Sequence, residues 1–346
     1  MKKKLKRLVR RKKTVEAPQT PAKITSETMS AHREEVLDNA RKYIYPLRHS
    51  KRRLVTLSLS ILAVAAVLFF TYCTVALYKF QSTSMFLYRV SQVIPFPIAK
   101  AGPNFVAYEN YLFEINHYTH YYENQQQLDF DSDAGQRQLQ EFKKRALDKV
   151  VNDAYIKEIA NQRGISVSSQ EVDDEIATVR NQNRLGSSDK EFEDVLKDFW
   201  GWSVDDFRRS LKQQILSQKV LSSLDSNTHD RANQAYDQLQ GGKDFAKLAK
   251  EVSEDPSTKN NGGEFGFRIE KNNRDISATV VDTLFNLQSG QYSEPIEAGY
   301  GLEIVKNLEN KNDKIRAAHI VFNFKNINEY LNDIKDEKPA RTYISF

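Results

Sequence analysis

The sequence predicts an α+β protein with one transmembrane helix near its amino end. Three observations lead to this class: an uncharged apolar run at residues 54–78, helical periodicity further along the chain, and strand-like patterns with glycine turns from residue 230. We expect five segments: a basic tail at 1–53, a transmembrane helix at 54–80, a connector at 81–105, a helical region at 106–226 and an α+β domain at 227–346.

The apolar run fixes the expected location of the protein. Residues 54–78 are 25 consecutive positions without a charged side chain, which exceeds the ~20 residues that a helix needs to cross a bilayer core. Residues 1–53 carry 17 Lys+Arg against 5 Asp+Glu, whereas residues 81–346 carry 33 against 41. Because basic flanks stay in the cytoplasm, the sequence predicts a single-pass cell-membrane protein with a cytoplasmic amino end and a large extracytoplasmic portion.

Two processed forms do not fit this run. A cleaved signal peptide has an apolar stretch of about 7–15 residues and a small-x-small site, and a lipoprotein cysteine follows a small residue, whereas Cys73 follows Tyr72. Cys73 is the only cysteine, so disulfides within the chain, CxxC redox chemistry and thiolate metal sites are excluded. We expect Cys73 to be a lipid-facing apolar residue, with palmitoylation or dimer formation as the alternative.

The tail contains KKKLKRLVRRKK at residues 2–13. This run has no interleaved aromatics, and about 50 mostly polar residues cannot build a nucleic-acid-binding fold, so no nucleic-acid partner is expected. Juxtamembrane basic clusters bind anionic lipid, which is the partner we expect at the tail, with a cytoplasmic partner or RNA as the alternative. Residues 14–30 have a disordered composition, and residues 31–46 are expected to form a short helix.

The region 106–226 reads as five helices. The longest helix is expected at 134–163 and ends at Gly164. Another is expected at 189–199, and two more begin after Ser168 and Ser203, which have the residue type of helix caps. His117 and His120 share a helix face and could bind zinc, but no cysteine or HExxH pattern supports this over simple packing. No cofactor is expected. Without a catalytic signature, these helices indicate a binding scaffold.

From residue 230 the chain contains five motif-like stretches: G-x-D-F-A-x-L-A at 242–249, S-x-D-x-S at 253–257, G-G-x-x-G at 262–266, F-x-L-x-x-G-x-x-S-x-P at 285–295 and G-Y-G-L-E-I-V at 299–305. In these stretches and in their order, the sequence resembles the parvulin family of peptidyl-prolyl isomerases. The segment that begins at Ile94 and the helices after it resemble the chaperone region of the SurA/PrsA type in helical layout and order.

One strand of the parvulin pattern is out of place. Parvulins begin with a strand that reads roughly R-A-x-H-I-L, but SSLDSNTHD precedes Arg231, and the matching element is Ile315–Phe322, after the last hairpin. The resemblance therefore implies a circularly permuted domain, a four-stranded antiparallel sheet with surrounding helices in which residues 315–324 occupy the first-strand position beside 300–308. A second copy of the domain does not fit the 27 residues after His319. Residues 341–346 are expected to add an edge strand.

The resemblance also implies the site residues. The catalytic positions fall on His319, Asp255 and Glu303, and the substrate-binding positions on Ile276, Val280 and Phe285. We expect His319 and Asp255 to pair in one groove with Ile276 and Val280 in its floor. The alternatives are a core histidine at His319, a turn-forming aspartate at Asp255 and a packing role for Phe285.

Two functions from different classes follow. An X–Pro bond exchanges in tens to hundreds of seconds, so an isomerase of this type would act as a foldase on unfolded or proline-containing exported polypeptides, without a cofactor. The alternative is a non-catalytic holdase or an envelope interaction protein, because Glu303 stands where the family has a second histidine and Val280 where it has a phenylalanine. A protease is not indicated, because no HExxH or Ser/His/Asp pattern is present.

Overall fold

The computed structural model describes residues 25–44, 47–181, 188–273, 275–299 and 301–346. Contacts divide the chain into two compact units, Met1–Tyr72 and Cys73–Phe346. The basic run at 2–13 lies outside the described residues. In the first unit, α1 spans Ser26–Ile44 and therefore includes residues 26–30, which we had expected to be disordered. After α1, α2 spans Leu47–Thr74 and leads into one turn of π-helix at Val75–Lys79.

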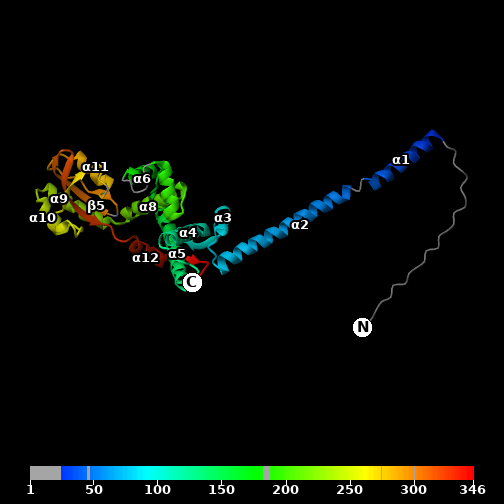
Figure 1. The fold of residues 1–346 in the computed structure, drawn as a ribbon, viewed down its shortest axis with the longest axis horizontal. Helices are drawn as coiled ribbons and strands as arrows, with labels where there is room; N and C mark the ends of the chain where they lie inside the picture. The colour runs from blue at the N-terminus through cyan, green and yellow to red at the C-terminus, as the bar shows by residue number, and fades with distance from the viewer. Residues whose placement is uncertain (1–24, 45–46, 182–187, 274, 300) are drawn as a thin grey trace. The chain divides into compact units, whose positions relative to one another are not determined.

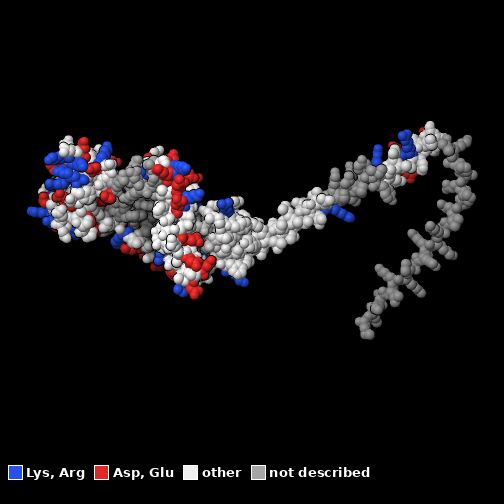
Figure 2. All heavy atoms as spheres, viewed as in Figure 1, with Lys and Arg blue, Asp and Glu red and all other residues white. Residues whose placement is uncertain are grey.

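The helical stretch Arg53–Lys79 is, within the described residues, the one helix that is long and apolar enough to cross a membrane, with a mean hydropathy of 2.5. In Figure 2, α2 beyond its basic end carries neither blue nor red atoms. The side chains from Leu54 to Tyr72 are exposed, but Cys73, Ala76 and Leu77 are buried. Cys73 is therefore not lipid-facing, because its small side chain packs in the core cluster of the second unit.

The segment expected to be a plain connector has structure of its own. It contains α3 (Met85–Val93) and the strands β1 (Pro97–Ala101) and β2 (Asn104–Ala107), which pair antiparallel. Sequence patterns missed these strands because each is short and Pro95, Pro97 and Pro103 interrupt the segment.

Five helices follow, as predicted, and they build the helical region. They are α4 (Tyr108–Gln125), α5 (Asp133–Arg163), α6 (Ser169–Asn181), α7 (Asp189–Trp200) and α8 (Val204–Leu224). Ser203 and Asp206 form a reciprocal capping box at the start of α8, and Gly164 ends α5 in the left-handed conformation with φ 68°. His117 stacks on Trp202 with ring centroids 4.3 Å apart, and burial lowers the pKa of His117 to about 4.

The α+β domain is a four-stranded antiparallel sheet in the order β3-β6-β5-β4. Its strands are β3 (Glu264–Glu270), β4 (Ile296–Ala298), β5 (Gly301–Lys311) and β6 (Lys314–Asn323). The helices α9 (Ser226–Gln240) and α10 (Phe245–Val252) pack on one face, and α11 (Ala278–Asn286) packs on the other (Figure 1). Each face of the sheet is therefore buried.

Of the predicted range 315–324, residues 315–323 form a strand beside β5, within β6 (Lys314–Asn323). The β5–β6 hairpin turns at Asn312 and Asp313, which have φ angles of 54° and 55°. Positive φ at both central residues is typical of the tight two-residue turns that match the twist of paired strands. This turn places β6 between β5 and β3, in the middle of the sheet.

The end of the chain returns to the helical region. The helix α12 (Ile327–Glu337) contributes Leu331 and the segment after it contributes Ile344 to the cluster that also holds Tyr108. The strand β7 (Arg341–Thr342) pairs with β1. Residues 341–346 therefore do not extend the four-stranded sheet, and residues from 327 onward pack apart from the domain at 227–346 to which we had assigned them.

Candidate active site

The central strand β6 places His319 on one face of the sheet. Alternation along the strand puts Ile315, Ala317 and His319 on the face covered by α11, and Ala318, Ile320 and Phe322 on the opposite face. His319 is 8% exposed. It therefore lies at the margin of the core rather than on an open surface.

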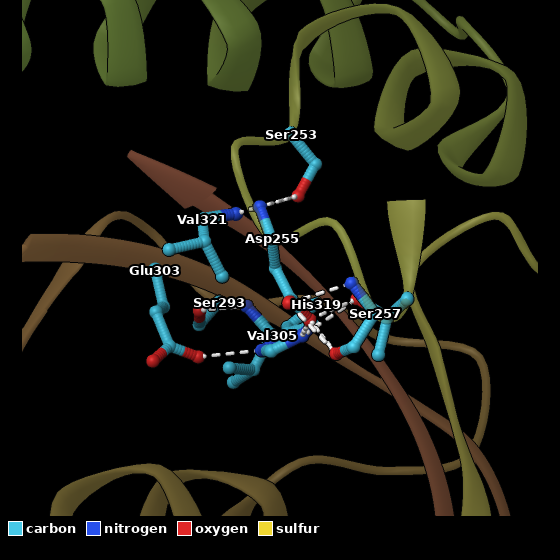
Figure 3. Close-up of polar contacts among 9 residues, drawn as sticks. Ser253, Asp255, Ser257, Ser293, Glu303, Val305, His319 and Val321 are labelled. Carbon is cyan, nitrogen blue, oxygen red and sulfur yellow. Dashed lines mark hydrogen bonds and ion pairs between the residues drawn. The ribbon is translucent and has the colours of Figure 1, made fainter. Parts of the chain in front are cut away.

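Each ring nitrogen of His319 faces a carboxylate oxygen. Nδ1 lies 2.8 Å from Oε2 of Glu303, and Nε2 lies 3.0 Å from Oδ2 of Asp255 (Figure 3). Glu303 is on the neighbouring strand β5, two residues before Val305, which pairs with His319. The three residues predicted as catalytic thus meet around one imidazole, and the expected His319–Asp255 contact is direct.

The Asp255 carboxylate is oriented by its own loop. Its Oδ1 accepts hydrogen bonds from the Ser257 backbone N–H at 3.0 Å and from the Ser257 hydroxyl at 2.7 Å. Thr258 Oγ1 donates to Oδ2 at 2.5 Å and lies 2.9 Å from His319 Nε2. Asp255 is therefore both a turn former and a partner of the histidine, so the two alternatives considered for it do not exclude each other.

Backbone contacts lock this loop onto β6. The Glu254 N–H donates to the Val321 carbonyl at 2.9 Å, and the Val321 N–H donates to Ser253 Oγ at 3.2 Å. The Gly263 carbonyl accepts the His319 N–H at 2.9 Å. Gly263 has φ 82°, and a Cβ there would lie 2.1 Å from the His319 carbonyl oxygen. Only glycine permits this approach.

Apolar side chains surround the histidine on the same face. The Phe265 ring centroid lies 4.2 Å from that of His319, and the two planes are tilted by 41°. Ile276 and Val280 belong to the cluster on this face, with Phe285 packed against it. Val280 is fully buried, Ile276 is 9% exposed and Phe285 is half-buried. Of the three predicted substrate-binding residues, Val280 therefore supports the surface from beneath.

The charges of the site follow from these contacts. Burial disfavours a charged His319, but the hydrogen bonds and charges of Glu303 and then Asp255 outweigh it and raise its pKa above 6.5. Burial also works to raise the pKa of Asp255, but hydrogen bonds from Thr258, Ser257 and His319 hold that pKa well below its usual range. These contacts favour the protonated form of His319, in which each ring nitrogen donates to a carboxylate.

This arrangement suits a reaction without a covalent step. A histidine that is protonated and bonded at both nitrogens has no lone pair with which to act as a nucleophile or base. The site offers charged groups in fixed positions beside the Phe265 ring, with Ile276 and Phe285 in the apolar cluster on the same face of the sheet.

Sequence reasoning did not single out Thr258 or Phe265. Thr258 directly follows the S-x-D-x-S motif and Phe265 lies within G-G-x-x-G. Their positions inside recognised motifs were the available signal, but their contacts with His319 depend on the folding of β3 against β6.

The antiparallel sheet with its histidine–carboxylate network is joined to a helical scaffold, and known families match both parts of the chain. The SurA-like N-terminal domain matches residues 46–221, and the PPIC-type PPIASE domain matches residues 216–309. Because the first match covers more than half of the chain, the chain belongs to the SurA-like family and carries a parvulin-type peptidyl-prolyl isomerase domain.

Curated relatives bear the name foldase protein PrsA. The protein of Lacticaseibacillus paracasei is 32% identical over 133 residues, covering 31% of this chain and 44% of its own length. That of Halalkalibacterium halodurans is 26% identical over 178 residues, covering 42% and 52%. That of Clostridium botulinum strain Okra is 22% identical over 249 residues, covering 61% and 72%. The chain spans about half the length of the first of these relatives.

Proposed function

We propose that this chain is a membrane-anchored foldase that acts outside the cytoplasm and isomerises X–Pro bonds in unfolded exported polypeptides. The observation that carries the proposal is the His319 network on the sheet of the PPIC-type domain. Relatives named foldase protein PrsA support it. The helical region would hold the extended client while the sheet domain acts on its prolines.

The chemistry requires a surface that favours a twisted amide. Rotation about the X–Pro bond is slow because ~18–20 kcal/mol of amide resonance opposes it. Resonance separates charge, which water stabilises, so an apolar surface around the bond favours the twisted state relative to the planar one. In our proposal Phe265, Ile276 and Phe285 hold the proline ring. His319, fixed by Asp255 and Glu303, orients the adjoining carbonyl.

The test is proline exchange in a tetrapeptide with the full chain. We expect His319→Ala to lower the exchange rate by about tenfold or more, which corresponds to ~1.4 kcal/mol of lost transition-state stabilisation. His120→Ala, in the helical region, is the matched control and should leave the rate unchanged. A His319→Ala chain that folds and exchanges proline at the original rate contradicts the catalytic role.

A holdase without turnover is the second candidate. It is favoured by the low exposure of His319, whose nitrogens are already bonded, and by the full burial of Val280. Under this alternative, His319→Ala leaves suppression of client aggregation intact and the wild-type chain does not accelerate proline exchange. Measuring both activities on the same preparations separates the two functions.

The proposed topology places the amino end in the cytoplasm. Its support is the apolar helix Arg53–Lys79 and the basic residues that precede it. The basic tail would then contact anionic lipid of the inner leaflet. Protease added to intact spheroplasts should digest residues 81–346 and spare the tail, and protection of the large portion contradicts this orientation.

We also infer that the isomerase domain is circularly permuted. The family match ends at residue 309, yet the histidine-bearing strand β6 begins at Lys314 and lies at the centre of the sheet. A solved relative whose first domain strand occupies the place of β6 would support the inference. A relative with its own equivalent of β6 after the last hairpin would contradict it.

A further inference from the structure

Exposed apolar side chains gather where the chain leaves α2. Among the described residues of the second unit, nine large apolar side chains are exposed, and five of them lie between Val75 and Val93. These five are Val75, Phe80, Met85, Phe86 and Val93. Phe346 is also 45% exposed, and its neighbour Ser345 accepts a hydrogen bond from Gln81 at 2.8 Å. Such a concentration on a soluble portion indicates an interaction surface.

The length of the exposed part of α2 places this surface at the membrane boundary. Leu54–Tyr72 would span about 28 Å at ~1.5 Å per residue, close to the ~30 Å of a bilayer core. Burial by protein begins at the next residue, Cys73. Tyr72, which is 56% exposed, has the amphipathic ring that is enriched at membrane–water interfaces. Because Cys73 directly follows Tyr72 in the chain, the buried part of the second unit begins one residue after this apolar stretch.

The helix α3 turns an apolar face outward. Met85, Arg89 and Val93 recur at a spacing of four and are exposed, whereas Leu87 and Ser91 on the other face are buried. Leu87 packs in the same cluster as Cys73 and Leu77, so α3 is fixed against the first residues of the second unit. Val93 is 83% exposed, which is costly for a valine in water.

We propose that the outer face of α3, with Phe80, lies in the interfacial layer of the lipid bilayer. The partner is the lipid surface itself. Met85, Phe86 and Val93 would enter the boundary between headgroups and acyl chains, and the exposed Lys79 and Arg89 would meet lipid phosphates. This rests on the proposed membrane anchor. Its consequence is that the domain is held against the bilayer at two points instead of swinging from one helix.

Collision accessibility of spin labels in the full chain tests the proposal. Single cysteines replace Met85, Val93 or Leu62 in a Cys73→Ala chain reconstituted in vesicles of phosphatidylcholine with phosphatidylglycerol. Phe199→Cys and Phe267→Cys are the matched controls, since these phenylalanines are 44% and 46% exposed elsewhere in the second unit. We expect labels at 85 and 93 to collide with oxygen, relative to a water-soluble nickel reagent, several-fold more than the controls.

The label at Leu62 separates the two possible failures. If it is lipid-buried while labels at 85 and 93 behave like the controls, the anchor stands and the interfacial position of α3 is wrong. If the label at 62 is itself water-accessible, the anchor fails and the inference falls with it. A lipid-buried label at 62, together with labels at 85 and 93 that collide with oxygen more often than the controls, supports both the membrane anchor and the interfacial position of α3.

Discussion

His319 lies between two carboxylates on different elements, Glu303 on β5 and Asp255 on the loop before β3. A neutral imidazole has one N–H and can donate to only one of them, whereas the protonated ring donates to both. Protonation of His319 therefore links the strand to the loop, and loss of one partner leaves a buried charge without its counterion, which is costly.

The titration of His319 is the first residue-scale prediction. Its imidazole NMR signals should titrate with a pKa above 6.5, because Glu303 and Asp255 outweigh burial. Glu303→Gln should lower that pKa, and the imidazole signals of His229, on α9, serve as the internal reference. A His319 pKa at or below 6.5 in the wild type contradicts the charge assignment.

The pH dependence of stability follows with a definite sign. A raised histidine pKa stabilises the fold below about 6.5, and this contribution disappears as pH rises through the folded pKa. A lowered aspartate pKa stabilises above about 3.8, and this disappears as pH falls through the folded value. The difference in unfolding free energy between wild type and His319→Gln should therefore shrink as pH rises. A difference that grows would overturn the assignment.

Gly263 gives a residue-scale prediction with a built-in control. Gly263→Ala must place a Cβ 2.1 Å from the His319 carbonyl oxygen, whereas Gly266, with a similar φ of 80°, has open space around it. Gly266→Ala should cost about 1–2 kcal/mol from backbone strain alone, and Gly263→Ala about 1–3 kcal/mol more from the clash. Urea unfolding measures both. Equal costs would mean that the close approach to β6 is absent.

At this scale the sequence predicted the charged partners but not their neighbours. His319, Asp255 and Glu303 each stand at a motif position, so a pattern could place them. Thr258 and Phe265 have ordinary roles in a loop and a strand, and only the packing of β3 on β6 brings them to the histidine. The burial of Val280 could not be predicted either, because the sequence pattern is the same for an apolar residue that lines a pocket and for one that lies beneath its surface.

Among the elements, Asp225 connects the two segments by which the chain passes between the helical region and the sheet domain, one entering α9 and the other leaving β6. It caps α9 by accepting from the Thr228 N–H at 3.1 Å, and it accepts from the Lys325 N–H at 2.9 Å where the chain leaves β6. The Thr228 hydroxyl also reaches the Asn323 carbonyl at 3.3 Å. One fully buried carboxylate thus fixes the outgoing and the returning segment.

We expect Asp225→Ala to destabilise the protein by about 3 kcal/mol or more, because a charged acceptor is lost and buried N–H groups remain. Asp244→Ala removes a comparable cap from α10 at an exposed site and should cost about 1 kcal/mol. Chemical denaturation of the two variants measures the contrast. Similar losses would show that Asp225 acts only as a helix cap.

Long helices were predictable and short strands were not. The α5, α7 and α8 boundaries follow caps and glycines that lie next to them in sequence. The sheet β2-β1-β7 joins segments from opposite ends of the second unit, so no local pattern reports it. The prediction that Cys73 faces lipid was wrong for a related reason, because an apolar residue at the end of α2 suits lipid and a protein core equally well.

At the scale of the whole molecule, the chain end closes the helical core. Ile344 is 5% exposed within that core, and the Tyr343 N–H donates to the Ile98 carbonyl at 2.8 Å. Ile344→Ala should therefore cost about 2–5 kcal/mol, while Thr342→Ala, an exposed neighbour, should stay within about 0.5 kcal/mol. Thermal or urea unfolding checks this, and a negligible effect of Ile344→Ala would mean that the end does not pack there.

The pairing of β7 with β1 has a consequence for the order in which the protein can be assembled. Gln81 and Ser345, which meet at the closed end, are 264 residues apart along the chain. During synthesis the helical scaffold emerges long before the segment that completes it, and β5 emerges before the strand that carries His319. The scaffold and the site are therefore both incomplete until residues 314–345 have been made. Long-range closure of this kind slows folding, so a newly made copy would pass through a period in which its helical core and its site are both unfinished.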